Sequence, residues 1–307
     1  MKKVVILTQK PFSSMAVDGI KEILEAKEYS VVIVEKYKTI DETYETIKDA
    51  NALIVRSDII DETVMDHAPE LEIIVRAGAG YDSIDLAAAS KRNIVVENTP
   101  GQNANAVAEL VFAMMLYNAR HHFNGSTGSE LRGKKLGIQG LGAVGKNVAR
   151  IADGFGMDVY YFDSSYPIEV ANERGVQFAG TLENLYKTCQ YVTIHIPLSE
   201  SNLHSINYDL ISLMPKNAVL INTSRSEVVD DDDIMRILAE RPDFSYLADV
   251  PCAYMEEMAE KYSDRSLFSL KKCGAQTAEA NNNAGMAAAN QIVNFFESGI
   301  KKYQVNP

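Results

Sequence analysis

The first hundred residues alternate short apolar runs with stretches whose apolar positions recur at helical spacing. Uninterrupted apolar runs between helices are typical of parallel strands, which are buried on both faces of a sheet. The pattern predicts helices over 15–26 and 41–48 and five strands, at 4–7, 31–34, 52–55, 71–75 and 94–96. We therefore expect a five-stranded parallel α/β domain at this end of the chain.

The alternation stops at Asn98-Thr99-Pro100-Gly101, where turn-forming residues precede a long helical pattern over 103–120 and a loop over 124–128. It then resumes, with a final helix predicted over 278–296 and five strands, at 136–139, 159–162, 191–196, 218–222 and 246–250. The fold class predicted is thus α/β, with two doubly wound parallel-sheet domains.

A glycine motif gives the strongest chemical signal. Gly140, Gly142 and Gly145 form G-x-G-x-x-G directly after a predicted strand and at the start of a predicted helix over 144–151. Asp163 closes the next predicted strand. This is the context of dinucleotide binding, in which the glycines allow a tight turn, close approach of the pyrophosphate and close helix packing. Asp163 would accept hydrogen bonds from the adenosine ribose and repel a 2′-phosphate, so we expect NAD rather than NADP.

Length and charge exclude several classes of partner. The 307 residues suit two domains at about 150 residues each. They carry 30 Lys and Arg against 42 Asp and Glu, a net charge of −12, which argues against nucleic acid and anionic membranes. Cys189, Cys252 and Cys273 lie far apart, as expected in a reducing compartment. Without a signal peptide or a long apolar stretch, we expect a cytoplasmic protein and no membrane segment.

Four successive aspartates, at 230–233, directly precede an apolar helical pattern. Carboxylates are favoured at a helix N-terminus because they cap its free amides and match its dipole. We interpret this run as a helix cap and not as a metal site, and we expect no bound metal.

Four segments together resemble the D-2-hydroxyacid dehydrogenase family, and within it the short D-3-phosphoglycerate dehydrogenases. They are the hinge and helix at 98–110, the glycine loop at 137–145, the strand end at 193–198, and the segment 220–230 with its arginine. The resemblance implies a Rossmann-type NAD-binding domain, 100–279, inserted into a flavodoxin-like substrate domain made of 1–99 plus 280–307. It also implies a cleft that closes over the substrate and a homodimer through the 103–120 helix. The chain ends at Pro307, and we expect no serine feedback through an added regulatory domain.

The resemblance implies hydride transfer between the nicotinamide and the carbon that bears the substrate hydroxyl. Arg225 falls on the family's catalytic arginine, and a planar guanidinium can grip a carboxylate with two hydrogen bonds. On the cofactor side the resemblance adds, to the glycines and Asp163, the residues Ala143, Val144, His195, Pro197, Thr223 and Asp249.

Two catalytic positions depart from the family. Lys272 stands where the histidine is usual, and Tyr254 stands in place of the glutamate. Short members with lysine at this place form a subgroup that the chain resembles, so we interpret Lys272 as the general acid and base. A lysine can act so if its pKa falls from about 10.4 through burial and nearby positive charge, here from Arg225 and Lys271. The alternative is an NAD-binding sensor without turnover.

Several residues at the carboxyl ends of the first strands predict the substrate. Lys10 and the Arg56-Ser57 pair, which resembles a phosphate-binding pair, lie there, together with the small residues Ala77 and Gly78 that suit a carboxylate; Asn103 adds a further hydrogen bond. We therefore predict NAD-dependent oxidation of D-3-phosphoglycerate to 3-phosphohydroxypyruvate. The alternative is a general D-2-hydroxyacid dehydrogenase or a hydroxypyruvate/glyoxylate reductase.

Overall fold

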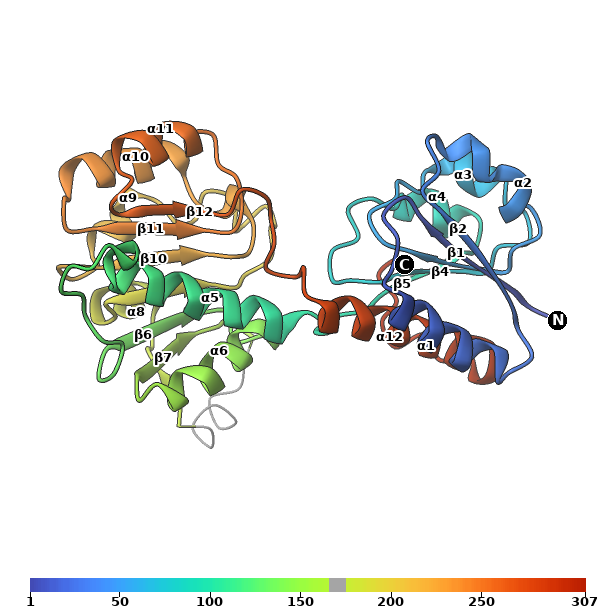
Figure 1. Cartoon of the computed structure of the whole chain (residues 1–307), viewed down its shortest axis with the longest axis horizontal. Coiled ribbons are helices and arrows are strands. Elements are labelled where there is room, and N and C mark those ends of the chain that lie inside the picture. The colour runs from blue at the N-terminus through green and yellow to red at the C-terminus, as the bar shows by residue number, and fades with distance from the viewer. Residues whose placement is uncertain (166–174) are drawn as a thin grey trace. The chain divides into compact units, whose positions relative to one another are not determined.

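The computed structural model describes residues 1–165 and 175–307 and divides into two compact units (Figure 1). Unit 1 comprises Met1–Asn103 and Gln276–Pro307, and unit 2 comprises Ala104–Ala275. The second boundary precedes the last helix, α12 (Ala278–Ser298), instead of cutting it. Thr277 caps that helix by accepting a hydrogen bond from the amide of Ala280, so the whole helix belongs to one unit.

Unit 1 contains the predicted five-stranded parallel sheet, in the order β2-β1-β3-β4-β5 that is typical of flavodoxin-like folds. Every strand lies within two residues of its predicted position. The strands are β1 (Lys3–Thr8), β2 (Ser30–Glu35), β3 (Ala52–Val55), β4 (Ile73–Arg76) and β5 (Val95–Asn98).

Alternate residues of these strands face two separate cores. Val4 and Ile6 pack with α1 (Ser14–Glu25) and α12, whereas Val5 and Leu7 pack on the opposite side of the sheet. The helices on that side are α2 (Tyr44–Ile47), α3 (Glu62–Asp66) and α4 (Leu86–Lys91). The predicted helix at 41–48 is divided between a 3-10 turn, η1 (Ile40–Thr43), and α2.

Unit 2 contains a seven-stranded parallel sheet in the order β12-β11-β10-β9-β6-β7-β8, which is the doubly wound order of a Rossmann fold with one added strand. Five strands match the prediction, although β9 and β11 each end two residues earlier than expected. The two short edge strands, β8 and β12, were not predicted. The strands are β6 (Lys135–Gln139), β7 (Asp158–Phe162), β8 (Gln177–Phe178), β9 (Tyr191–Ile194), β10 (Val219–Asn222), β11 (Ser245–Ala248) and β12 (Ser266–Phe268).

Helices cover both faces of this sheet. α5 (Ala104–Ala119) and α6 (Ala143–Gly154) pack on one face. The other face carries α8 (Leu182–Thr188), α9 (Tyr208–Ser212), α10 (Asp231–Glu240) and α11 (Met255–Lys261). Asp230 caps α10 by accepting a hydrogen bond from the amide of Asp233, which confirms that the aspartate run caps a helix.

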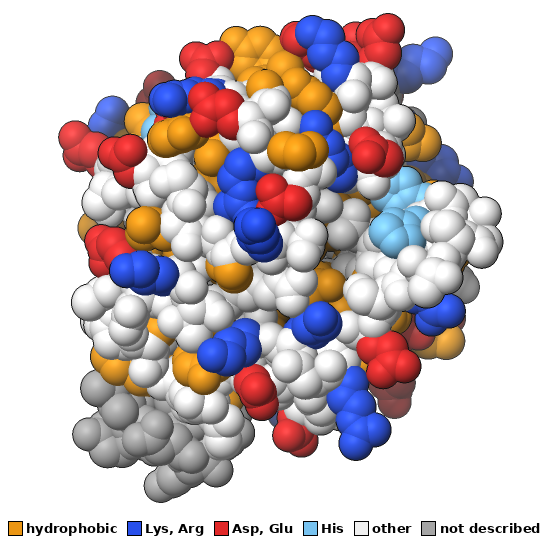
Figure 2. Space-filling model, turned by 90° about the vertical axis from the view of Figure 1, so that its left-hand side faces the viewer, with side chains coloured by type: hydrophobic (Ala, Val, Ile, Leu, Met, Phe, Trp, Pro, Cys, Tyr) orange, Lys and Arg blue, Asp and Glu red, His pale blue; other side chains and the backbone are white. Residues whose placement is uncertain are grey.

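The molecular surface mixes both signs of charge. On the face drawn in Figure 2, Lys and Arg side chains are interspersed with Asp and Glu side chains. Within 1–165 and 175–307, no helix is long and apolar enough to cross a membrane. In the same described residues, no group of three or more His, Cys, Asp or Glu side chains is placed to hold a metal ion.

Candidate active site

The glycine turn joins β6 to α6 at the point where the strand order of unit 2 reverses. Gly140 has a φ of +94°, and a Cβ atom there would lie 2.7 Å from the carbonyl oxygen of His195. A Cβ atom on Gly145 would lie 2.2 Å from the carbonyl oxygen of Gly140. Both positions therefore require glycine for reasons internal to the protein.

Gly142 differs from the other two glycines of the motif, because a side chain there would meet no protein atom in the described part of the chain. It is the N-cap of α6 with an ordinary φ of −71°, and a Cβ atom there would meet no atom within 4 Å among the described residues. Gly142 and Ala143 are exposed, and Val144 follows in the first turn, where backbone amides have no helical acceptor. An open cradle at a helix N-terminus fits the pyrophosphate of a dinucleotide.

This difference predicts opposite effects for one added methyl group. Gly145→Ala should lower the free energy of unfolding by about 1–3 kcal/mol, because the facing carbonyl is fixed. Gly142→Ala should leave stability within about 0.5 kcal/mol of the wild type but weaken NAD binding by about tenfold or more. Chemical denaturation and NAD titration check both. Unchanged NAD affinity in Gly142→Ala would contradict the placement of the pyrophosphate.

Asp163 lies directly after β7, beside the glycine turn. Its Oδ2 accepts a hydrogen bond of 2.7 Å from the amide of Leu141, and its Oδ1 accepts one of 2.8 Å from the amide of Ser165. The carboxylate is thus held at the carboxyl edge of the sheet. Ribose binding by this carboxylate stays a prediction.

His195 follows β9 on the other side of the glycine turn. Its amide donates to the carbonyl of Gln139, and its Nε2 lies 2.9 Å from the hydroxyl of Thr193. Burial lowers the pKa of His195 to about 3, so the imidazole is neutral at physiological pH. It is therefore suited to a neutral polar contact. Pro197 is exposed nearby in sequence, and its carbonyl accepts from Asn202.

The two predicted catalytic side chains meet at one backbone oxygen. Nη1 of Arg225 donates to the carbonyl of Ser224 at 3.1 Å, and Nζ of Lys272 donates to the same carbonyl at 2.9 Å. The structure therefore brings together two cations that lie far apart in the sequence. Ser224 supplies a shared acceptor that sequence reasoning did not identify.

Asn222, the last residue of β10, orders the loop that carries Arg225. Its side-chain Nδ2 donates to the carbonyl of Arg225 at 2.8 Å. Its Oδ1 accepts from the backbone amide and from the hydroxyl of Ser224, both at 3.0 Å. Between them, Thr223 is buried, and its hydroxyl has no hydrogen-bond partner among the described residues. A buried hydroxyl of this kind is available to a bound cofactor.

Asp249, at the end of β11, holds the loop that carries Lys272. Its Oδ1 accepts from the amide of Cys273 at 2.9 Å and from the thiol of that residue at 3.3 Å. Its Oδ2 accepts from the amide of Gly274 at 2.8 Å. Asp249 is 1% exposed, so these bonds lie away from bulk water. Its predicted contact with the cofactor remains a prediction.

The surroundings of Lys272 differ from the expected ones in two ways. Its side chain is exposed, so the expectation that burial lowers the pKa of Lys272 is wrong. A carboxylate is also near: the pKa of Glu227 is lowered by its own backbone amide, by the hydroxyl of Ser226, and by the charges of Arg225 and Lys272. Glu227, two residues beyond Arg225, is a neighbour that sequence reasoning missed.

Tyr254 does not replace the family's glutamate in this group. Its hydroxyl donates to Oδ1 of Asp232 at 2.6 Å, at the start of α10. The side chain is therefore bound to the aspartate run that caps that helix.

In unit 1, Arg56 follows β3 and makes hydrogen bonds to the loop after β1 and to α12. Its Nη1 donates to the carbonyls of Lys10 and Pro11, at 3.1 and 2.8 Å, and its Nη2 donates to Oδ1 of Asn281 at 2.6 Å. Burial lowers the pKa of Arg56 and Asp58 opposes this, but a guanidinium stays charged at physiological pH. The structure thus places Arg56 beside the loop of Lys10.

Arg76, the last residue of β4, is a third cation at this edge. Its Nε donates to the carbonyl of Arg56 at 2.8 Å, and a Cβ atom on Gly78 would lie 1.3 Å from its Nη1. Gly78 has a φ of +153°, and Ala77 before it is buried. From the sequence we expected Ala77 and Gly78 to bind a carboxylate. We did not predict that Gly78 leaves space for the guanidinium of Arg76.

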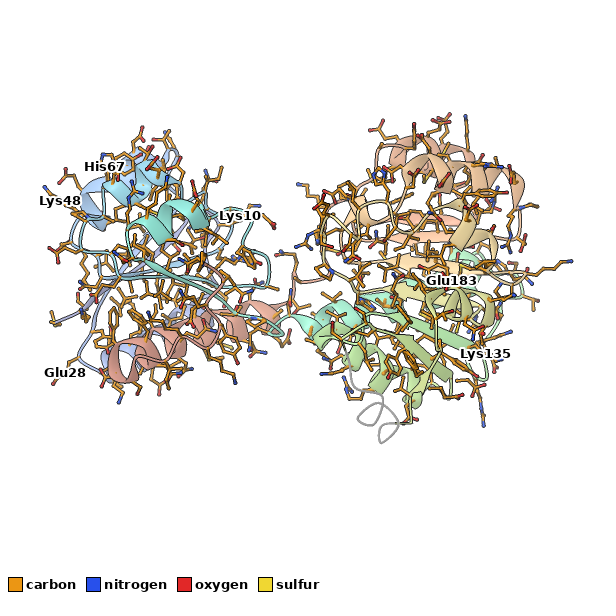
Figure 3. All side chains as sticks on the ribbon, turned by 180° about the vertical axis from the view of Figure 1, so that it is seen from behind. Lys10, Glu28, Lys48, His67, Lys135 and Glu183 are labelled. Carbon is orange, nitrogen blue, oxygen red and sulfur yellow. The ribbon has the colours of Figure 1, made fainter. Side chains whose placement is uncertain are left out.

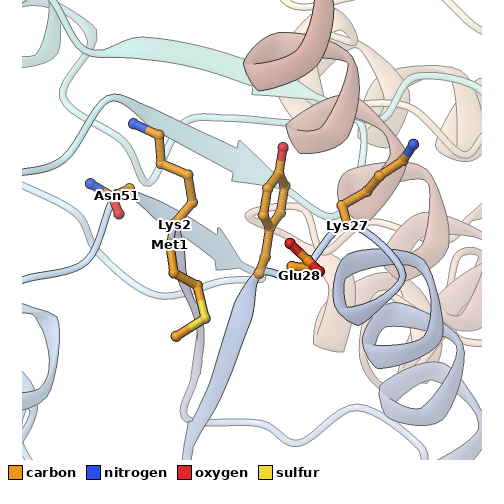
Figure 4. A pocket seen from close by; sticks show the side chains of 6 residues that line it. Met1, Lys2, Lys27, Glu28 and Asn51 are labelled. Atoms are coloured by element: carbon orange, nitrogen blue, oxygen red, sulfur yellow. The ribbon is translucent and has the colours of Figure 1, made fainter.

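The remaining predicted residues of unit 1 lie close to this edge in the sequence. Lys10, labelled in Figure 3, and Ser57 are exposed on loops that follow β1 and β3. Asn103 is half-buried just before α5. A hollow of about 850 Å³ lies elsewhere in unit 1 (Figure 4), lined by Met1, Lys2, Lys27, Glu28, Tyr29 and Asn51. It contains none of the predicted substrate residues.

Comparison with known proteins decides the family. The family described as "D-isomer specific 2-hydroxyacid dehydrogenase, NAD binding domain" matches residues 107–275, which is more than half of the chain. The chain belongs to the D-isomer specific 2-hydroxyacid dehydrogenase family. This confirms three expectations from the sequence: the fold class, NAD as the cofactor, and that the protein is a dehydrogenase.

Relatives within this dehydrogenase family differ in their named substrates. The D-3-phosphoglycerate dehydrogenase of Methanocaldococcus jannaschii is 33% identical over 98% of the chain, which spans 59% of that relative's length. The glyoxylate reductase of Thermococcus litoralis is 32% identical over 85% of each chain. The NAD⁺-bound structure of 3-phosphoglycerate dehydrogenase from Entamoeba histolytica is 43% identical, with a TM-score of 0.88 over 100% of this chain and 99% of that one.

Proposed function

We propose that this protein oxidises D-3-phosphoglycerate to 3-phosphohydroxypyruvate with NAD, as a step toward serine. The observation that carries the proposal is the convergence of Arg225 and Lys272 on the carbonyl of Ser224. A cation for the substrate carboxylate and a base for its hydroxyl are thus neighbours. The 43% identity to the Entamoeba histolytica 3-phosphoglycerate dehydrogenase supports the same substrate.

In the proposed mechanism, the guanidinium of Arg225 exchanges the Ser224 carbonyl for the substrate carboxylate and orients the reacting carbon. Nζ of Lys272, in its neutral form, takes the proton of the substrate hydroxyl as the alcohol becomes a ketone. NAD, when bound, supplies the acceptor for the hydride that leaves the same carbon. Asn222 and Asp249 keep the two loops in place, because each fixes its loop through several hydrogen bonds.

Residues of unit 1 would select the phosphorylated substrate. Arg56, Arg76 and Lys10 gather at the carboxyl ends of β1, β3 and β4. Three positively charged side chains at this edge favour a dianionic phosphate over a neutral hydroxymethyl group. We also propose a homodimer through α5, a largely apolar helix.

The second candidate is glyoxylate or hydroxypyruvate reduction, because the Thermococcus litoralis glyoxylate reductase is 32% identical. NADH absorbance separates the candidates. Purified protein with NAD and D-3-phosphoglycerate at alkaline pH should produce NADH faster than with D-glycerate. Faster NADH consumption with glyoxylate than with 3-phosphohydroxypyruvate would favour the reductase. A flat trace with every substrate, while NAD still binds, would favour a sensor.

Arg56→Met should lower kcat/KM for D-3-phosphoglycerate by about 10- to 100-fold, since a charge-assisted hydrogen bond is worth about 1.5–3 kcal/mol. The value for D-glycerate should fall much less, because this substrate lacks the phosphate. Steady-state kinetics with both substrates provides the check, and the unphosphorylated substrate controls for lost contacts to Pro11 and Asn281. Equal losses on the two substrates would argue against phosphate binding by Arg56.

A further inference from the structure

The side chain of Asn281, near the start of α12, meets the guanidinium of Arg56 within unit 1. Its Oδ1 accepts a hydrogen bond of 2.6 Å from Nη2 of Arg56, and both side chains are half-buried. The two residues are 225 positions apart in the sequence, so only the fold brings them together. Asn281 is not one of the residues that the sequence predicts to bind substrate or cofactor, and the proposed function gives it no role.

The orientation of the Asn281 amide is fixed by its own helix. Nδ2 of Asn281 donates to the carbonyl of Thr277 at 2.9 Å, one turn earlier in the chain. A carbonyl can only accept a hydrogen bond, so it selects the nitrogen of the amide and leaves the oxygen to face Arg56. Aspartate in this place would set a carboxylate against the same carbonyl. Asparagine thus holds the guanidinium without neutralising its charge.

The guanidinium of Arg56 is fixed by further contacts to the loop after β1. Its Nη1 donates to the carbonyls of Lys10 and Pro11 at 3.1 and 2.8 Å, and its Cζ lies over the ring of Phe12. Together with the bond to Asn281, these bonds use three of the five N–H groups of the side chain. Among the described residues, no acceptor takes the other two, which are Nε–H and one N–H of Nη2. Two N–H groups are what a bidentate bond to a phosphate requires.

We propose that Asn281 is a specificity-determining residue that acts through Arg56. It holds Nη2 so that the two remaining N–H groups of Arg56 stay available to the phosphate of the substrate. A long arginine side chain loses conformational freedom when it binds a ligand, and one that is already ordered loses less. Asn281 is thus a positioning residue that favours phosphorylated over unphosphorylated substrates. This inference rests on the proposed function, in which Arg56 binds the phosphate.

The contact with Asn281 also affects the neighbouring cationic segments. Arg56 connects α12 to the loop of Lys10, and its own carbonyl accepts from Nε of Arg76 at 2.8 Å. A guanidinium that moves away from Asn281 would loosen its bonds to the carbonyls of Lys10 and Pro11 as well. Removal of the Asn281 side chain should therefore weaken substrate binding and leave the chemical step largely unchanged.

The test is the reduction of 3-phosphohydroxypyruvate and of hydroxypyruvate by NADH, followed by absorbance. Asn281→Ala should raise the KM for 3-phosphohydroxypyruvate by about 3- to 10-fold, because a hydrogen bond that positions a charged group is lost. The value of kcat should change by less than about twofold, and the KM for hydroxypyruvate should stay near that of the wild type. The Tm should not fall, since alanine is the better helix former.

Asn282→Ala is the matched control, because Asn282 is the next residue of α12 and bonds to Ser13 and Met15 instead. It should leave both KM values unchanged. A double variant tests whether Asn281 acts through Arg56. Once Arg56→Met has removed the guanidinium, Asn281→Ala should add little further loss, because residues that act as a unit are not additive.

The proposal is overturned if Asn281→Ala changes the KM of both substrates equally, or if its effect is undiminished in the Arg56→Met background. An unchanged preference for the phosphorylated substrate in Asn281→Ala would overturn it as well, while the proposed function would stand. If the wild type itself does not prefer 3-phosphohydroxypyruvate, the proposed function fails and this inference fails with it. The wild-type measurement therefore separates the two failures.

Discussion

Lys272→Ala should lower kcat for D-3-phosphoglycerate oxidation by about 10²- to 10⁴-fold, the usual contribution of a general acid or base. The loss should occur without a large loss of stability, because the side chain of Lys272 is exposed. Stopped-flow or steady-state measurement of NADH formation gives kcat. Thermal unfolding of the same preparation checks that the fold is intact.

The pH dependence of this variant tests whether Lys272 is the group that must lose its proton before oxidation. Oxidation requires a neutral amine, so the wild-type rate should rise with pH as more of the lysine loses its proton. The residual rate of Lys272→Ala should lack that rise. Lys271→Ala is the matched control for the loss of an exposed lysine, and its rate should still rise with pH, with at most a shift of the midpoint from the lost positive charge. If Lys272→Ala keeps near-wild-type turnover, Lys272 is not the acid and base.

Asp249→Ala should be the most destabilising of the proposed substitutions, at about 2–5 kcal/mol. The change leaves the buried amide of Gly274 and the part-buried amide of Cys273 without their acceptor, and an unpaired buried group costs about 1–3 kcal/mol. Because these amides hold the loop of Lys272, kcat should fall as well. Urea denaturation measures the first effect, and NADH formation under conditions where the variant is folded measures the second.

A double variant tests whether Asp249 acts through Lys272. If it does, Asp249→Ala combined with Lys272→Ala should lose little more activity than Lys272→Ala alone, because effects of residues that act as a unit are not additive. NAD titration of Asp249→Ala separates this role from cofactor binding. Fully additive losses of kcat would show that Asp249 contributes by another route.

The elements with strong periodicity were predictable from the sequence, and the short edge elements were not. Ten strands and the long helices α1, α5 and α12 have continuous apolar patterns that local analysis detects. β8 has two residues and β12 has three, which is too short for any alternation to appear. Their strand conformation depends on pairing with β7 and β11, which is a tertiary effect.

The candidate site was predictable where its signal is local. The glycine turn has a recognisable local spacing and the cap at Asp230 bonds within its own first turn, and the structure places both at the start of a helix as expected. Ser224 and Arg76 were missed because their roles come from where loops meet in space. Asn222 was missed although its partners, Ser224 and Arg225, are its neighbours in the sequence. The exposure of Lys272 was also missed, because no nearby residue in the sequence determines the burial of a loop side chain.

The Ser224 carbonyl has a consequence for how this enzyme can change over evolutionary time. An acceptor that belongs to the main chain cannot be removed by exchanging the side chain at its position, because every amino acid provides the same oxygen. The meeting point of Arg225 and Lys272 is therefore inherited with the path of the loop. A substitution of Ser224 would remove the hydrogen bond of its hydroxyl to Asn222 but would leave the carbonyl, so the paired cations stay in place as long as the path of the loop is kept.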